Sequence, residues 1–229
     1  MGYELGDEIL DRLRERFEVV DEEFVARRVA RTTSDPFRTL VVVIISQNTA
    51  ERNTAAAYKR LEERVGVEPE KILEAGVEAV AEAIRPAGLQ EAKARAIVEA
   101  ARLVAERYGG DMRRLMGEGP EAVREVLLGI PGIGDKTVDV LLSNWGYPVV
   151  AVDTHVRRVA RRLGLAEKSG YRAVRESLHR VFRPERRLEA HLLLILLGRR
   201  VCRAREPRCR ECPLRDLCAY ARKMGVTDT

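Results

Sequence analysis

The sequence of 229 residues lacks any apolar run long enough to cross a membrane. Its longest runs, residues 40–45 and 192–197, have the length of core segments. The N-terminal residues are charged and amphipathic, without the apolar region of a signal peptide. We therefore expect a cytoplasmic, nucleoid-associated protein with no membrane partner.

Lysine and the side-chain amides are also scarce. Only six of the 41 basic residues are lysine, glutamine occurs only at positions 47 and 90, and asparagine only at 48, 53 and 144. Few amides together with abundant arginine and glutamate suggest a thermophilic source, although the lack of lysine does not fit that pattern.

Cysteine is confined to one short segment, with four residues between positions 202 and 218. In a cytoplasmic protein, such clustering favours metal ligands over disulfides. Charge is concentrated in the same region. Residues 199–223 contain nine basic and three acidic side chains, a net +6 against +5 for the whole chain. This region either binds a polyanion such as DNA or is a solvated tail.

The sequence has no convincing strand pattern, and apolar residues recur with helical spacing along most of it. The short connections between these segments favour an all-α fold. The apolar segments 37–46 and 191–197 should be buried central helices. Residues 148–152 are expected to form a buried extended connector and to mark a domain crossing. Further helices are predicted at 7–17, 50–64, 69–75, 77–85, 90–107, 120–128, 135–144, 154–163, 170–182 and 184–201.

A glycine-rich turn joins two predicted helices at residues 129–134. Gly132 and Gly134 can adopt positive φ angles and leave no side chain between the backbone and a ligand. The amides at the start of the following helix can then bind phosphate. This pattern is typical of a helix-hairpin-helix that grips the DNA backbone, although an ordinary corner between helices uses the same residue types.

Lys136 lies in the first turn of the second hairpin helix. The helix dipole disfavours a cation there, which favours the neutral amine, a nucleophile able to form a Schiff base with a sugar aldehyde. A surface lysine that contacts phosphate is the alternative. Asp153 precedes another predicted helix, where it either only caps the helix or also stabilises positive charge on a reacting sugar.

The four cysteines have the spacing Cys-x6-Cys-x2-Cys-x5-Cys. Four thiols so close together suit either zinc or an iron–sulfur cluster. The paired knuckles of a zinc ribbon are missing, which weakens zinc without excluding it. The predicted ligands are Cys202, Cys209, Cys212 and Cys218.

The segments 130–137 and 152–155, together with the cysteine spacing, resemble the endonuclease III family of helix-hairpin-helix DNA glycosylases over about residues 7–222. The resemblance implies a fold of two all-α domains with a DNA-binding cleft between them. A six-helix barrel at 29–148 would contain the hairpin at about 120–145. Residues 1–28 and 149–229 would form a discontinuous cluster domain.

The resemblance also implies roles for individual residues. Lys136 matches the family's Schiff-base lysine and Asp153 its catalytic aspartate. Gln47 matches the glutamine that fills the gap left by an extruded nucleotide, and Leu89 matches the wedge on the opposite strand. The four cysteines would hold a structural 4Fe–4S cluster. The predicted phosphate contacts of the cysteine loop are Arg203, Arg205 and Arg208.

The sequence therefore predicts a monomeric base-excision-repair enzyme that acts on double-stranded DNA containing damaged bases or abasic sites. It would remove damaged bases, oxidised pyrimidines above all, and nick the strand by β-elimination. The alternatives are a monofunctional mismatch or adenine glycosylase and a non-enzymatic DNA-binding module with zinc. Asp135, Asp139 and Ala50 depart from residues common in the family, which leaves lesion preference open.

Overall fold

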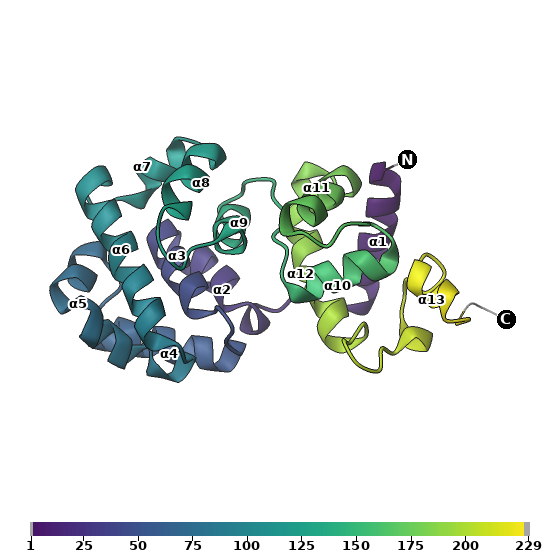
Figure 1. Ribbon diagram of the computed structural model, residues 1–229, viewed down its shortest axis with the longest axis horizontal. Helices are drawn as coiled ribbons and strands as arrows, with labels where there is room; N and C mark the ends of the chain where they lie inside the picture. The colour runs from purple at the N-terminus through teal and green to yellow at the C-terminus, as the bar shows by residue number, and fades with distance from the viewer. Residues whose placement is uncertain (1, 227–229) are drawn as a thin grey trace. The chain divides into compact units, whose positions relative to one another are not determined.

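Residues 2–226 are described in this computed structural model, and within that range the chain is helical without a β-strand (Figure 1). The expected all-α class is confirmed. No helix in the described range has both the length and the apolar character needed to span a membrane.

The chain divides into two units, each with its own internal packing. Unit 1 comprises residues 1–19 and 146–229, and unit 2 comprises residues 20–145. The first boundary thus lies before the expected one at 28–29, because α2 (Val25–Thr33) packs against α3 (Pro36–Ile45) of unit 2. The second boundary lies close to the expected one at 148–149.

Helix α3 is the centre of unit 2. All but one of its residues are buried, and it contacts α2, α4, α6, α7 and α9. The prediction of a buried apolar helix at 37–46 is confirmed. The other helices of this unit, besides α2, are α4 (Glu51–Arg64), α5 (Pro69–Ala83), α6 (Gln90–Tyr108), α7 (Met112–Gly117), α8 (Pro120–Leu128) and α9 (Asp135–Asn144).

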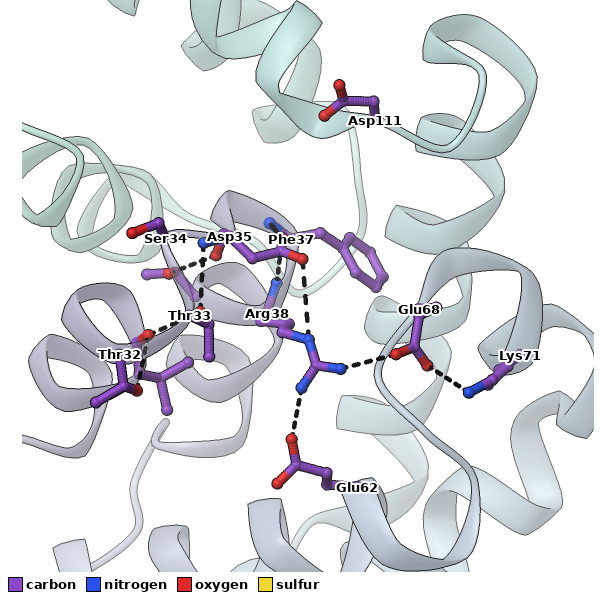
Figure 2. A network of polar contacts seen from close by, with 12 residues as sticks. Thr32, Thr33, Ser34, Asp35, Phe37, Arg38, Glu62, Glu68, Lys71 and Asp111 are labelled. Atoms are coloured by element: carbon purple, nitrogen blue, oxygen red, sulfur yellow. Dashed lines mark hydrogen bonds and ion pairs between the residues drawn. The ribbon is translucent and has the colours of Figure 1, made fainter.

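Polar contacts fix the start of α3 within this core (Figure 2). The Asp35 carboxylate caps the helix by accepting a hydrogen bond from the Phe37 amide at 2.8 Å. Arg38, in the first turn, donates to Glu68 at 2.7 Å and also pairs with Glu62, so it joins α3 to α4 and to the start of α5. Both carboxylates come from outside α3, and the arginine therefore ties three elements together.

Unit 1 is organised around α12 (Arg187–Arg200), whose residues 190–198 are all buried. This confirms the second predicted central helix. Helix α1 (Gly2–Arg16) packs against α11 (Tyr171–Val181) and α12, although most of the sequence separates them. Arg186 reinforces this packing by pairing with Asp7 at 3.1 Å and Asp11 at 2.9 Å. The remaining α-helices of the unit are α10 (Thr154–Leu163) and α13 (Ala219–Lys223).

The helix predictions differ from the structure in a few places. Helices α2, α7 and α13 were not predicted, because each is too short for a periodic pattern to extend over several turns. The prediction of separate helices at 69–75 and 77–85 agrees with the structure. The two halves of α5 are separated at Gly76, where the backbone leaves the helical conformation with a φ of 75°.

Candidate functional site

The glycine-rich turn joins α8 to α9 through two tight backbone turns. The Ile130 amide donates to the Leu127 carbonyl at 3.1 Å, and the Ile133 amide donates to the Ile130 carbonyl at 3.0 Å. Gly132 has a φ of 91°, and a Cβ there would also lie 3.4 Å from the Cβ of Ala96. The positive φ favours glycine at this position, while the distance to Ala96 is an ordinary van der Waals contact.

Gly134 differs from the expectation of a positive φ angle. Its φ is −115° and it is the N-cap of α9, in extended backbone. A Cβ on Gly134 would meet no atom within 4 Å. Because glycine has no side chain, Gly134 cannot cap α9, and the amides of the first turn donate no hydrogen bond to an N-cap side chain. This leaves the helix start open to an anionic ligand.

Lys136 is the second residue of α9 and is half-buried. Within the described residues of its own unit, no group accepts a hydrogen bond from its Nζ atom. An amine held at a helix start without an acceptor remains available to a ligand.

Gln47 lies in the turn after α3 and contacts the same hairpin. Its Nε2 donates to the Gly132 carbonyl and to the Thr137 hydroxyl, each at 3.0 Å. The two acceptors lie on either side of Lys136 in the sequence. The structure therefore brings together Gln47, Gly132, Gly134 and Lys136, which are predicted site residues from two distant segments.

Leu89 is the N-cap of α6 and has a φ of 50°. Left-handed backbone is uncommon for residues other than glycine, and it is unfavourable here because the leucine side chain gains no local hydrogen bond. The side chain is 65% exposed, the most of any large apolar side chain in the described range. Leu89 thus combines strained backbone with an exposed apolar side chain, which marks this turn as a candidate contact surface.

Arg124 of α8 was not singled out by sequence analysis. It forms an ion pair with Asp139, which is fully buried in α9, and its second nitrogen lies 3.9 Å from Asp135. The two acidic residues that depart from the family pattern thus share one arginine, which clamps the helices of the hairpin together. The signal available in the sequence was Asp139 itself, because an acid on a buried helix face needs a partner.

Asp153 is the N-cap of α10, as predicted. Its carboxylate accepts a hydrogen bond from the Val156 amide at 2.7 Å, and the residue is half-buried. Since a capping bond uses only part of the carboxylate's acceptor capacity, the cap does not exclude a second role. Lys136 belongs to unit 2 and Asp153 to unit 1.

The connector before Asp153 is extended but is not part of a sheet. Side chains of unit 1 take the place of a neighbouring strand. The Val150 amide donates to His179 Nε2 at 3.1 Å, and the Val152 amide donates to the Tyr171 hydroxyl at 3.3 Å. His191 Nδ1 donates to the carbonyl of Ala151 at 2.8 Å. These three side chains, which sequence analysis missed, fix the approach to Asp153.

The four cysteines are free thiols and line a single pocket in unit 1. Burial, reinforced by the charges of the neighbouring thiols, raises the pKa of Cys212 to about 11. Burial also raises the pKa of Cys209. In the described part of the chain, no three His, Cys, Asp or Glu side chains are arranged as a ready metal site. The structure thus gathers the four cysteines around one space.

The loop after Cys202 is held from α10. Arg162 donates to the carbonyls of Arg203 at 2.6 Å and Ala204 at 3.1 Å, and its guanidinium lies 4.7 Å from the centre of the Tyr220 ring. The side chains of this loop point outward. Arg203, Arg205 and Arg208 are exposed in this loop.

Comparisons with known proteins agree with these features. A family model described as "HhH-GPD superfamily base excision DNA repair protein" matches residues 41–184. The chain is 34% identical to endonuclease III of Sulfolobus acidocaldarius, over 95% of this chain and 96% of the relative. It is 36% identical to endonuclease III of Escherichia coli K12, over 96% of this chain and 97% of the relative.

Among solved structures, the fold is similar to that of a trapped covalent intermediate of endonuclease III with DNA. The TM-score is 0.78 at 28% identity, covering 96% of this chain and 98% of that one. A thermostable thymine-DNA glycosylase shares the fold with the same TM-score at 23% identity. The chain therefore belongs to the HhH-GPD superfamily of base excision DNA repair proteins and, within it, to the endonuclease III family.

Proposed function

We propose that Lys136 is the nucleophile and Asp153 the assisting carboxylate in the DNA glycosylase and abasic-site lyase activity of this enzyme. The observation that carries the proposal is the environment of Lys136. Its amine has no acceptor in its own unit and lies in the first turn of a helix whose N-cap residue offers no capping side chain. The similarity to a trapped covalent endonuclease III–DNA complex supports covalent chemistry.

In the proposed reaction, the damaged nucleotide first leaves the base stack, because its sugar is not accessible inside the duplex. Lys136 Nζ forms a bond to the C1′ carbon while the bond from C1′ to the base breaks. Asp153 stabilises the positive charge that develops on the sugar. The departing base takes up the proton that the amine loses. Cleavage of the C1′–O4′ bond then gives a Schiff base on Nζ. Transfer of a C2′ proton to water breaks the C3′–O bond and expels the 3′ phosphate, which nicks the strand, and hydrolysis of the Schiff base by water releases Lys136.

The proposed DNA contacts surround this chemistry. The hairpin amides near Gly132 and Gly134 and the exposed arginines of the cysteine loop would bind phosphates. Gln47 would fill the gap left by the extruded nucleotide, with Leu89 as the wedge in the opposite strand. The proposed substrates are oxidised or saturated pyrimidines, and abasic sites, in double-stranded DNA.

We further propose that the four cysteines hold a 4Fe–4S cluster. The residues fit, because four thiols line one pocket and no disulfide joins them. Such a cluster would cross-link the C-terminal segment and so fix the basic loop. Broad visible absorption in the purified protein, together with iron and sulfide analysis, distinguishes this cofactor from zinc.

Borohydride trapping on duplex DNA with an abasic site tests the assignment of Lys136. We expect wild type to form a covalent complex and Lys136→Ala to form none. Lys59→Ala removes an exposed lysine of the same unit and is the matched control, expected to trap normally. A lack of trapping by wild type, or undiminished trapping by Lys136→Ala, would overturn the lyase mechanism.

Asp153→Asn separates catalysis from capping. Asparagine keeps an oxygen for the Val156 amide and removes the charge. We expect base removal to slow by about 100-fold or more, with thermal stability nearly unchanged. Equal activity in the variant would leave Asp153 as a helix cap only.

The salt dependence of DNA binding tests the loop. Replacing Arg205 and Arg208 with alanine should lower the magnitude of the slope of log K against log salt by about 1 per lost phosphate contact. An unchanged slope would show that the loop does not contact phosphate.

A further inference from the structure

Lys93 lies one helical turn into α6. Although its side chain is ionisable, the residue is only 3% exposed. Its Nζ donates to the Ile45 carbonyl at 2.9 Å, to the Thr49 hydroxyl at 2.7 Å and to the Ala87 carbonyl at 3.0 Å. An ammonium group has three N–H donors, and here each has an acceptor. Burial lowers the pKa of Lys93.

The acceptors of Lys93 come from two different turns. Ile45 and Thr49 bracket the turn that carries Gln47, and Ala87 lies two residues before Leu89. Thr49 adds a second link between these turns, because its hydroxyl accepts from Lys93 and donates to the Ala87 carbonyl at 2.7 Å. A single buried cation therefore joins the turn of Gln47 to the turn of Leu89.

This connection continues to the hairpin. From the same turn, Gln47 donates to the Gly132 carbonyl and to the Thr137 hydroxyl. A chain of hydrogen bonds thus runs from α6 through the turn after α3 to the start of α9. The connection contains no ion pair. The bonds from Lys93 to Ile45 and Ala87 are buried, whereas the bond from Gln47 to Gly132 is exposed.

We propose that Lys93 is a positioning residue, which fixes the spacing between Gln47 and Leu89 so that both side chains enter the DNA duplex together. The inference rests on the proposed function, because it takes Gln47 and Leu89 as the residues that replace the extruded nucleotide. Lys93 touches neither DNA nor the reacting atoms. Lys93 influences the extrusion of the nucleotide from the duplex. It does not influence the attack by Lys136, which is a separate step.

The test compares two substrates with the same abasic site, one in a duplex and one in a single-stranded oligonucleotide, where no extrusion from a duplex is needed. Lys93→Met keeps most of the side-chain volume and removes the donors. Thr49→Val removes the hydroxyl link alone. Lys59→Met, on the exposed face of α4, is the matched control.

We expect Lys93→Met to lower kcat/KM for nicking the duplex by about 10-fold to 100-fold, as for other losses of positioning. Thr49→Val should lower it less. Both variants should nick the single-stranded substrate at nearly the wild-type rate. The fluorescence rise of 2-aminopurine placed opposite the abasic site, which reports unstacking in the duplex, should also shrink in both.

Equal losses on both substrates would overturn the proposal and leave Lys93 as a residue of general stability, and so would wild-type activity on the duplex. If Lys93→Met does not fold, the substrate ratio of Thr49→Val decides the question in the same way. Failure of the proposed function gives a different result, because wild type itself would then not trap on either substrate.

Discussion

The beginnings of α6 and α9 each carry a lysine, and the two lysines lie in opposite environments. Lys93 is buried and donates to three acceptors of its own unit. Lys136 is half-buried and has no acceptor there. The comparison shows that neighbouring carbonyls decide whether a lysine near a helix start holds the fold together or remains available for chemistry.

The largest expected effect is on stability. Lys93→Met should lower the free energy of unfolding by about 2 to 4 kcal/mol, because buried acceptors lose their partner. Lys136→Met should change it by less than about 0.5 kcal/mol, as is usual for a residue without structural partners. Urea denaturation followed by circular dichroism measures both. Similar losses in the two variants would break the comparison.

A smaller effect should connect the two regions. Because Gln47 joins the turn held by Lys93 to the hairpin, Gln47→Ala and Lys93→Met should not act additively on the free energy of unfolding. We expect a coupling energy of about 1 kcal/mol in the double-mutant cycle, typical of residues in one hydrogen-bond network. Strictly additive effects of the two substitutions on the free energy of unfolding would mean that the beginnings of α6 and α9 are energetically independent.

The change with pH in the contribution of Lys93 to the free energy of unfolding should be smaller than this coupling energy, and its sign can be predicted. Burial lowers the pKa of Lys93 from its ordinary value of 10.5, so between the folded pKa and 10.5 the unfolded chain binds more protons. The contribution of Lys93 to stability should therefore rise with pH across that window. The free energy of unfolding of wild type should therefore increase relative to that of Lys93→Met as the pH approaches 10.5. A difference that falls with pH would contradict the assignment.

The smallest expected effect is that of removing one of the proposed cluster ligands. Cys212→Ser should reduce visible absorption and loosen the cysteine loop. The acceptors of Lys93 and Gln47 all lie in unit 2, whereas the cysteines lie in unit 1. Amide hydrogen exchange at the starts of α6 and α9 should accordingly stay as in wild type. Faster exchange there would show that the two beginnings depend on the cysteine segment.

Much of the fold could be predicted because apolar periodicity is a local signal. The two apolar runs of the sequence predicted the central helices α3 and α12. The break at Gly76 could be placed because glycine leaves the helical conformation easily. Helix α2 was missed although Val25, Val29 and Ala30 lie on one buried face, because it is short and no capping side chain marks its start. Its packing against α3 determines its place, and that packing is not visible in the sequence.

The candidate site divides in the same way. The hairpin glycines and the cysteine spacing are contiguous patterns, so sequence alone located them. The local sequence around Lys136 is equally compatible with a phosphate-contacting lysine, and that around Asp153 with a helix cap. Only the family resemblance favours catalytic roles for both. Lys93 could not be found, because two of its three acceptors are backbone carbonyls, which every residue has. The role of a buried lysine is set by where the chain places those carbonyls.

The discontinuity of unit 1 has a consequence for biosynthesis. Helix α1 leaves the ribosome before all of unit 2, yet α11 and α12, which it contacts, are translated after unit 2. Unit 2 can fold as its own residues emerge, while α1 has no docking surface. The contact between Arg12 and Asp216 joins residues 204 positions apart. Its formation must await nearly complete translation, and the nascent chain carries an amphipathic helix without a partner until then.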